Sequence, residues 1–200
     1  MEINIRLAEP NDYAAIENLT REAFWNLSIP GCIEHYVVHQ MHETGDSLPE
    51  LEFVAEVEGR IVGHVIYGHA RIEGEPLEGL LYMGPISVDP PLQRRGIGSA
   101  LVRKSLYQAR VHHHPAVFAK GNPDFYKRFG FVSAAVFGIY MENRHELEPF
   151  FLVKELRRNA VNGFIGKFCP DQFHVPQMEQ VEAFDQKFPP KEKKALQEME

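Results

Sequence analysis

The stretch Ile86-Ser-Val-Asp-Pro-Pro-Leu-Gln93-Arg94-Arg95-Gly96-Ile97-Gly98-Ser99-Ala-Leu-Val102 decides how this chain folds. Its first residues read as a β-strand, and its last residues have the spacing of a helix. Between them, two arginines and two glycines form a loop that leads directly into the helix. Backbone N–H groups at a helix N-terminus attract anions, and guanidinium groups add positive charge. The stretch therefore predicts a binding site for a polyphosphate.

Two familiar phosphate-binding loops do not fit this sequence. A dinucleotide fold places Gly-x-Gly-x-x-Gly after its first strand, whereas residues 93–98 follow the fourth predicted strand. A P-loop is also excluded, because no Gly-Lys-Ser/Thr follows. Glycines at both 96 and 98 are unfavourable in the first turn of a helix unless the backbone must approach a ligand closely.

Length and composition are those of a soluble globular chain. The 200 residues are 44% hydrophobic and 24% charged, with a formal net charge of -7. An acidic chain lacks the basic face that general nucleic-acid binding needs. No long apolar window and no secretory signal occur, and Cys32 and Cys169 fit a reducing compartment. The sequence therefore predicts a cytoplasmic protein that has neither nucleic acid nor a membrane as a partner.

Hydrophobic periodicity predicts an α/β domain over residues 1–155 with the element order βααβββαβαβ. Strands are expected at 3–7, 53–57, 61–67, 80–88 and 116–119 and again from Phe131, and helices at 10–24, 33–41, 96–110 and 123–129. Residues 156–200 are predicted as a C-terminal extension that packs on the domain. Its expected anchors are Phe168, Phe173 and Phe184, and its charged end, 187–200, is expected to be a solvated helix or a frayed tail.

Gly84-Pro85 interrupts the strand at 80–88. Proline has no N–H to give to a sheet, so this pair predicts a bulge. A bulge in a central strand would splay it from the parallel strand at Val117-Phe118 and leave backbone groups at Ile86 and Val88 unpaired. A linear ligand with amide groups could then pair with them like an added strand.

These features resemble the GNAT superfamily of acetyl-CoA-dependent N-acetyltransferases. The family's signature, a splayed strand followed by Q/R-x-x-G-x-G/A, is matched by Gln93-Arg-Arg-Gly-Ile-Gly98. A second motif, Gly121-Asn122-Pro-Asp-Phe-Tyr126-Lys-Arg-Phe-Gly130-Phe131, is similar to the family's Asn…Tyr-x-x-x-Gly-Phe segment. The resemblance covers roughly residues 3–150 and favours a small subgroup with a C-terminal extension. It implies a GNAT-like three-layer α/β fold whose mixed central sheet has splayed parallel strands at the cofactor cleft.

The resemblance also implies acetyl-CoA as the co-substrate, with no metal. Backbone N–H groups of the loop would hold its pyrophosphate, and main-chain groups of the splayed strand would hold its pantetheine arm, which a downstream asparagine would also touch. The implied cofactor-binding residues are Ile86, Ser87, Val88, Gln93, Arg94, Arg95, Gly96, Ile97, Gly98, Ser99 and Asn122.

The implied reaction is direct transfer of the acetyl group to a primary amine. The N–H of Val88 would stabilise the oxyanion, and Tyr126 would act as the general acid for the CoA thiolate. The alternative for Tyr126 is a buried tyrosine that only packs. No carboxylate lies on the strand at 80–88, and a water chain is an alternative base, so no general base is assigned. The nearest candidates are better explained as surface or core residues: Glu34, His35 and His64.

Other interpretations stay open at this point. One is a non-catalytic regulatory module that binds acetyl-CoA, and another is a transferase for a longer acyl-CoA. The acceptor is a small-molecule or peptide amine that the sequence does not identify, and the extension could cap the acceptor side or contact a second subunit of a homodimer. The run His112-His113-His114 predicts a loop, because consecutive histidines cannot all face one metal ion.

Overall fold

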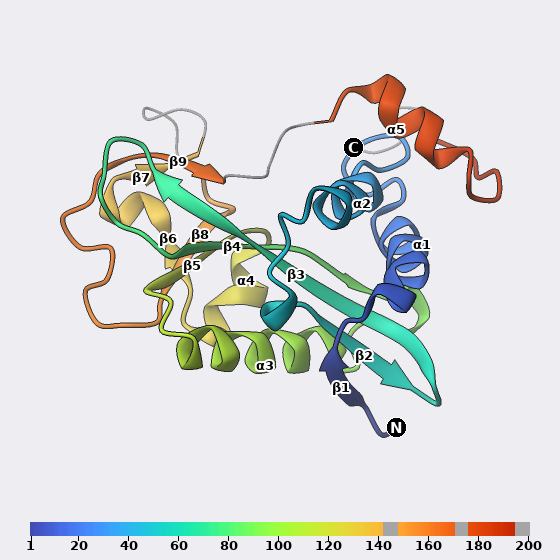
Figure 1. Cartoon of the computed structure of the whole chain (residues 1–200), viewed down its shortest axis with the longest axis horizontal. Coiled ribbons are helices and arrows are strands. Elements are labelled where there is room, and N and C mark those ends of the chain that lie inside the picture. Colours follow the sequence, from blue (N-terminus) through green and yellow to red (C-terminus); the bar gives the residue numbers. More distant parts are fainter. Residues whose placement is uncertain (142–147, 171–175, 195–200) are drawn as a thin grey trace. The chain divides into compact units, whose positions relative to one another are not determined.

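The computed structural model describes residues 1–141, 148–170 and 176–194 (Figure 1). The elements in chain order are β1 (Asn4–Leu7), η1 (Pro10–Asp12), α1 (Tyr13–Phe24), α2 (Glu34–Thr44), η2 (Pro49–Leu51), β2 (Phe53–Val57), β3 (Arg60–Ile72), β4 (Leu80–Val88), η3 (Pro90–Leu92), α3 (Ile97–Val111), β5 (Ala116–Lys120), α4 (Pro123–Tyr126), η4 (Lys127–Phe129), β6 (Val132–Ser133), η5 (Ala134–Phe137), β7 (Ile139–Tyr140), β8 (Phe151–Glu155), β9 (Gly166–Pro170) and α5 (Met178–Asp185), where η marks a 3-10 helix. No helix in these ranges is both long enough and apolar enough to span a bilayer.

The chain divides into two compact units. Unit 1 consists of Met1–Ile66, Pro85–Leu101 and the segment from residue 174 to the C-terminus. Unit 2 consists of Tyr67–Gly84 and Val102–Phe173. Strands β3 and β4 and helix α3 each begin in one unit and end in the other.

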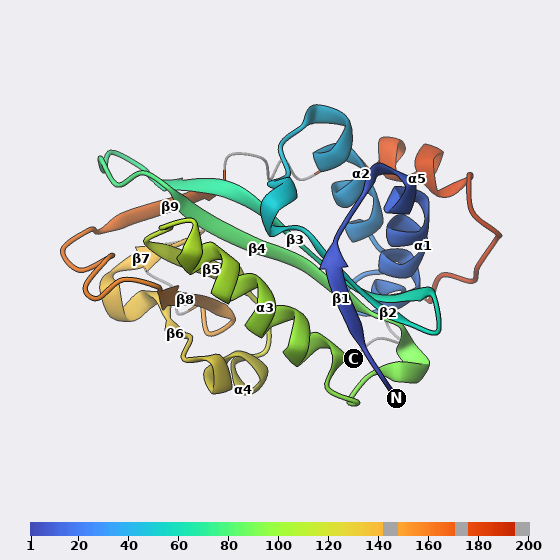
Figure 2. The same cartoon turned by 60° about the horizontal axis from the view of Figure 1, so that its bottom comes forward.

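The sheet of unit 1 is antiparallel, with β2 between β1 and the first half of β3 (Figure 2). Strands β2 and β3 form a hairpin whose two turn residues, Glu58 and Gly59, have φ values of 51° and 74°. Two positive φ angles are typical of the type I′ turn, whose twist matches that of the flanking strands. Residues 58 and 59 therefore form the tight turn between the strands predicted at 53–57 and 61–67.

Helix α3 packs against β3 at Gly63. A Cβ atom on this glycine would lie 2.8 Å from Ile97 and 2.9 Å from Leu101, both in the first turns of α3. Only a residue without a side chain allows this approach. The neighbouring His64 projects to the opposite face of the strand, since side chains alternate along a strand. This close packing fixes where the N-terminus of α3 lies in unit 1.

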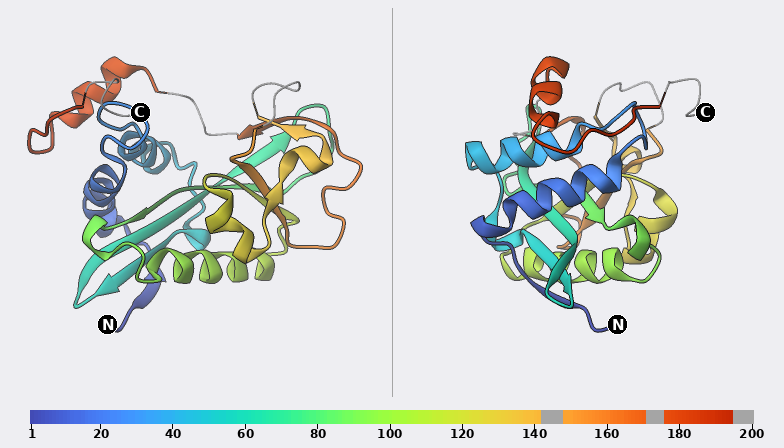
Figure 3. Two further views of the ribbon diagram at one scale, coloured as in Figure 1. Left: turned by 180° about the vertical axis from the view of Figure 1, so that it is seen from behind. Right: turned by 90° about the vertical axis from the view of Figure 1, so that its right-hand side faces the viewer.

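The other face of the unit 1 sheet is covered by α1 and α2, which pack against each other, with α5 beside α2 (Figure 3). Helix α1 buries Ile16, Leu19, Thr20 and Arg21. Helix α2 ends at Gly45, whose φ of 72° gives the left-handed cap that glycine favours.

A buried carboxylate links α2 to the sheet. One oxygen of Glu52, Oε1, lies 2.8 Å from Nε2 of His42 and 3.0 Å from Nε2 of His64. The ring of Tyr13 stacks on His42 at 3.6 Å. Burial tends to raise the pKa of Glu52, but the hydrogen bonds with the two histidines outweigh it and lower the pKa to about 2. Glu52 is therefore an anion inside the folded protein.

Acidification is expected to destabilise this protein from below pH 6.5. Burial lowers the pKa of His64, and it lowers the pKa of His35 from 6.5 to about 4. Because both histidines and Glu52 bind protons more readily in the unfolded chain, the free energy of unfolding falls as the pH decreases through 6.5 and then through 4.5. His35 alone should contribute about 3 kcal/mol of this loss by pH 4.

Thermal unfolding measured between pH 8 and pH 4 tests this expectation. Burial raises the pKa of Glu34, so this residue opposes the loss, but only near its own titration range. A Tm that stays constant from pH 7 to pH 4.5 would contradict the expected proton uptake on unfolding.

Unit 2 contains the parallel strand pair of a mixed sheet. Strand β4 runs parallel to β5 with the register Leu81↔Val117 to Met83↔Ala119. Strand β8 pairs antiparallel with β5 and also with β6. The α/β fold with a mixed sheet is therefore confirmed, and the parallel register ends one residue before Gly84, whose φ is 140°.

Two parts of unit 2 differ from the expected elements. The strand predicted from Phe131 is only two residues long, because η5 follows at once and ends at Gly138 with a left-handed φ of 72°. Strand β9 lies in the predicted C-terminal extension, for which no strand is expected because it contains Gly166 and Pro170. It pairs antiparallel with β3 (Ala70↔Pro170) and parallel with β7.

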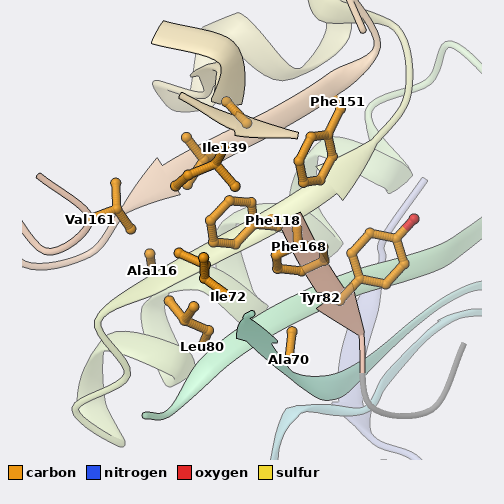
Figure 4. Close-up of a cluster of buried hydrophobic side chains, with 12 residues drawn as sticks. Ala70, Ile72, Leu80, Tyr82, Ala116, Phe118, Ile139, Phe151, Val161 and Phe168 are labelled. Atoms are coloured by element: carbon orange, nitrogen blue, oxygen red, sulfur yellow. The ribbon is translucent and has the colours of Figure 1, made fainter. Parts of the chain in front are cut away.

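The core of unit 2 is a cluster of aliphatic residues around three phenylalanines and a tyrosine (Figure 4). The ring of Phe118 lies 4.4 Å from that of Phe168 and 5.6 Å from that of Phe151. Phe168 thus joins β9 to β5 and β8. Of the three anchors predicted in the C-terminal extension, Phe168 and Phe184 are buried, and Phe173 lies outside the described residues.

Candidate cofactor and catalytic site

The predicted site residues fall into two groups, one in each unit. Unit 1 holds the end of β4, the basic loop and the start of α3, with Ile86, Ser87, Val88 and 93–99. Unit 2 holds Asn122 and Tyr126.

The basic loop has an unusual backbone. Residues 93–96 are exposed, and both Arg94 and Gly96 have left-handed φ values, 62° and 91°. For a residue with a side chain this conformation costs about 1 kcal/mol, and such strain is often found where a protein binds a ligand. Neighbouring contacts hold the loop in place. Gln93 donates from its side chain to the carbonyl of Val88 at 3.2 Å, and Arg60 pairs with Asp89 at 2.9 Å.

Helix α3 begins at this loop with backbone N–H groups that have no acceptor within the helix and could bind an anion. The N–H of Ala100 donates to the carbonyl of Gly96 at 2.9 Å, so Gly96 is the residue that caps the helix. The amides of residues 96–99 then have no acceptor within the helix. Its first turn contains no acidic residue. The positive end of the helix dipole is therefore left for a ligand rather than for a side chain.

One hydrogen bond shows which amides at the end of β4 face β3 and which face the opposite edge of the strand. The N–H of Asp89 donates to the carbonyl of Val62 on β3 at 2.9 Å. Peptide groups of an extended strand face its two edges alternately. The amide of Ser87 therefore faces β3, and the amides of Ile86 and Val88 face the opposite edge. The side chain of Ser87 is buried and bonds Thr20, so it is not a direct ligand group.

An open cavity of about 930 Å³ borders the loop. It is bordered by Arg95 and Leu92 and by the β2–β3 hairpin with Arg60. Three acidic side chains also line it: Glu2, Glu56 and Glu58. This mixture of charges does not favour a phosphate, so the helix N-terminus is the better anion site.

In unit 2, Asn122 and Tyr126 belong to the short helix α4. The side chain of Asn122 accepts a hydrogen bond from the N–H of Asp124 at 2.8 Å and so caps the helix. This cap leaves the amide nitrogen of the exposed Asn122 side chain for other partners.

Tyr126 is almost completely buried, 4% exposed, and packs edge-on against Phe125 and Phe131. Gly121 makes room for its ring, because a Cβ atom there would lie 2.6 Å from the ring carbon Cε2. Burial raises the pKa of Tyr126 to about 12. Its hydroxyl forms no hydrogen bond with any described residue. The group is therefore a protonated phenol that has its proton available at neutral pH.

The three candidate bases are occupied elsewhere. His64 is fully buried against Glu52, and His35 is fully buried. Glu34 accepts from the N–H of Ile33 at 3.0 Å. Within the ranges that the structure describes, no group of three or more histidine, cysteine or acidic side chains is suited to a metal ion.

The structure does bring together one arrangement that sequence reasoning missed. Sγ of Cys32 lies 3.3 Å from Nδ1 of His35, and Nε2 of His35 lies 3.4 Å from Oδ1 of Asp185 on α5. Burial raises the pKa of Cys32 to about 12. A cysteine nucleophile must be a thiolate. Cys32 is only 4% exposed and is protonated at neutral pH, which does not favour this cluster as a nucleophilic site.

Comparisons with known proteins agree with this geometry. A family model described as "Acetyltransferase (GNAT) domain" matches residues 49–133. The N-acetyltransferase YhbS of Escherichia coli (strain K12) is 31% identical over an alignment 170 residues long, which covers 81% of this chain and 92% of YhbS.

Two solved structures share the fold closely. The crystal structure of YhbS from Escherichia coli in complex with CoA has a TM-score of 0.74 at 29% identity, and the match covers 84% of this chain and 89% of that one. A GNAT family acetyltransferase from Brucella melitensis in complex with acetyl-CoA has a TM-score of 0.70 at 25% identity, with 87% and 97% covered. The fold, the loop and this degree of identity over nearly the whole of YhbS lead to one conclusion: the chain belongs to the GNAT family of N-acetyltransferases.

Proposed function

We propose that this protein transfers an acetyl group from acetyl-CoA to a primary amine by direct attack of the amine on the thioester. The observation that carries the proposal is the candidate anion site at residues 93–99, with two left-handed backbone positions, exposed arginines and a helix N-terminus whose cap residue, Gly96, has no side chain. Relatives solved with CoA and with acetyl-CoA support the choice of ligand.

Each part of the site has a role in this proposal. The amides of residues 96–99 bind the pyrophosphate, and Arg94 and Arg95 add charge. Ile97 contributes only its N–H, since its side chain is buried. The outward-facing peptide groups of Ile86 and Val88 bind the pantetheine arm as an added strand, and the amide nitrogen of Asn122 donates to the same arm.

The chemistry needs a proton at one place and a hydrogen bond at another. The amine nitrogen forms a bond to the carbonyl carbon, and the bond from that carbon to sulfur breaks. The N–H of Val88 stabilises the negative charge that develops on the carbonyl oxygen. Tyr126 gives its hydroxyl proton to the departing thiolate, and the proton lost by the amine passes through solvent and restores Tyr126.

The test is acetyl-CoA-dependent thiol release with a panel of amines, combined with calorimetric titration of CoA. Small polyamines, aminoglycosides, amino acids and peptide N-termini make up the panel. Micromolar CoA binding together with amine-dependent thiol release is the expected result. CoA binding without release for any amine would favour the regulatory module, and release only from longer acyl-CoA thioesters would change the donor.

Gly96→Ala is expected to weaken CoA binding about tenfold or more. The added Cβ meets no atom within 4 Å, so the variant keeps its packing but disfavours the φ of 91° that orients the loop amides. Gly45→Ala is the matched control, since Gly45 also has a positive φ of 72° and open space around it. Both variants should lose about 1 kcal/mol of stability, and only Gly96→Ala should change the Kd for CoA. Equal Kd values would contradict the loop as the pyrophosphate site.

A further inference from the structure

A pair of buried hydroxyl groups joins helix α1 to the end of β4. Oγ1 of Thr20 lies 2.9 Å from Oγ of Ser87. The two residues are 0% and 1% exposed. Inside a helix, a threonine hydroxyl usually bonds its own backbone or points to solvent. Thr20 instead bonds a residue of a strand, and it does so in the middle of an apolar helix face.

Ser87 occupies a special place on that strand. It lies between Ile86 and Val88, whose peptide groups face the edge opposite to β3. The carbonyl of Ile86 and the N–H of Val88 belong to the two peptide units that flank Ser87, so a force on the Ser87 side chain acts directly on them. The segment also follows Gly84-Pro85, past the end of the parallel register with β5. The contact from α1 therefore fixes a strand segment at the point where its own pairing with β5 has ended.

Helix α1 is itself held firmly, which makes it a suitable anchor. The next residue, Arg21, is 2% exposed, and its Nε donates to Oδ1 of Asp185 at 2.6 Å. The Arg21 guanidinium also lies 4.2 Å from the centre of the Trp25 ring. A hydroxyl on such a helix is a fixed reference point for the strand.

We propose that Thr20 is a positioning residue for the acetyl-CoA strand: its bond to Ser87 holds the peptide groups of Ile86 and Val88 in line with the pantetheine arm and the thioester carbonyl. This inference rests on the proposed function. Placement matters at this scale, because an error of about 1 Å at a reacting group can cost about 100-fold in rate. Thr20 does not touch the substrate and acts only through Ser87.

Thr20→Val removes the hydroxyl and keeps the shape, so it is the test variant. The probes are CoA and adenosine 3′-phosphate 5′-diphosphate, which is CoA without its pantetheine arm. In calorimetric titrations, Thr20→Val should raise the Kd for CoA about tenfold and leave the Kd for the shorter probe unchanged within about twofold. Thr20→Ser, which keeps the hydroxyl, should bind both probes as the wild-type protein does. A CoA-to-probe ratio that is unchanged in Thr20→Val would overturn the positioning role.

Two further variants separate positioning from stability. Thr20→Val with Ser87→Ala removes both hydroxyl groups and leaves no buried polar group without a partner, so much of the lost stability should return. The weakened CoA binding should persist, whereas a purely structural role predicts that it returns with the stability. Ser105→Ala breaks a similar buried hydroxyl pair with Tyr67, 2.8 Å apart, and should leave the ratio unchanged. If the wild-type protein binds the short probe and CoA equally well, both this inference and the pantetheine site fail, while failure in Thr20→Val alone leaves the proposed function intact.

Discussion

Replacing Tyr126 by phenylalanine should lower kcat by at least about 100-fold and leave the Kd for CoA within about twofold of the wild-type value. The phenylalanine ring fills the same space against Phe125 and Phe131, so the packing is kept. Only the proton donor for the thiolate is lost. Because the hydroxyl bonds no described residue, its removal leaves no buried partner unsatisfied, and Tm should change little.

The matched control is Tyr107→Phe, which removes the hydroxyl of a tyrosine on α3 that is 65% exposed. It should leave kcat unchanged. The raised pKa of Tyr126, about 12, adds a pH signature: kcat of the wild-type protein should show no loss from ionisation of this group between pH 8 and pH 10. Undiminished turnover in Tyr126→Phe would reduce this residue to a packing role and leave the thiolate to be protonated by water.

Asp185→Asn is expected to lower the free energy of unfolding by about 3 kcal/mol, because it removes the carboxylate charge 2.6 Å from the buried guanidinium of Arg21 and leaves only the partly exposed Glu22, 3.8 Å away. Asp185 is 19% exposed and reaches Arg21 from the C-terminal helix α5. In a chain of this size, such a loss should lower Tm by about 6–12 °C. Differential scanning calorimetry at pH 7.5 measures it.

Two variants decide whether charge burial is the cause. Glu182→Gln breaks the exposed ion pair between Glu182 of α5 and Lys193, a pair that does not include Arg21, and should cost less than about 1 kcal/mol. Arg21→Met combined with Asp185→Leu replaces both charges by apolar groups and should recover most of the loss. A double variant that is less stable than Asp185→Asn would show that the contact contributes through its geometry and not through charge pairing.

Local signals were enough to predict where β4 changes and where the basic loop lies. Gly84-Pro85 marks the position after which β4 leaves its parallel register with β5. Two glycines predict a loop with an unusual backbone, and the structure adds that Arg94, and not only Gly96, has a left-handed φ. Each of these features is set by residues close together in the chain, which is why the sequence alone could reveal them.

Long-range pairing was not predictable in the same way. Strand β9 contains Gly166 and Pro170, which indicate a loop until Ala70 to Ile72 supply a strand for it to join. Arg21 resembles a surface residue of a last helical turn, and its partner Asp185 is 164 residues away. The same holds for Glu52, whose buried carboxylate is stabilised by hydrogen bonds with His42 and His64. In each case the partner that makes the position favourable is absent from the local sequence.

Gly121 and Tyr126 carry an evolutionary consequence. The tyrosine ring occupies the space that any side chain at position 121 would need. Substitutions at the two positions are therefore coupled: Gly121 can be replaced only after Tyr126 has been replaced by a side chain without a ring there. A lineage that replaces Tyr126 by a smaller side chain would release this constraint. Position 121 would then be free to vary, and a glycine retained there records that an aromatic ring still occupies the space.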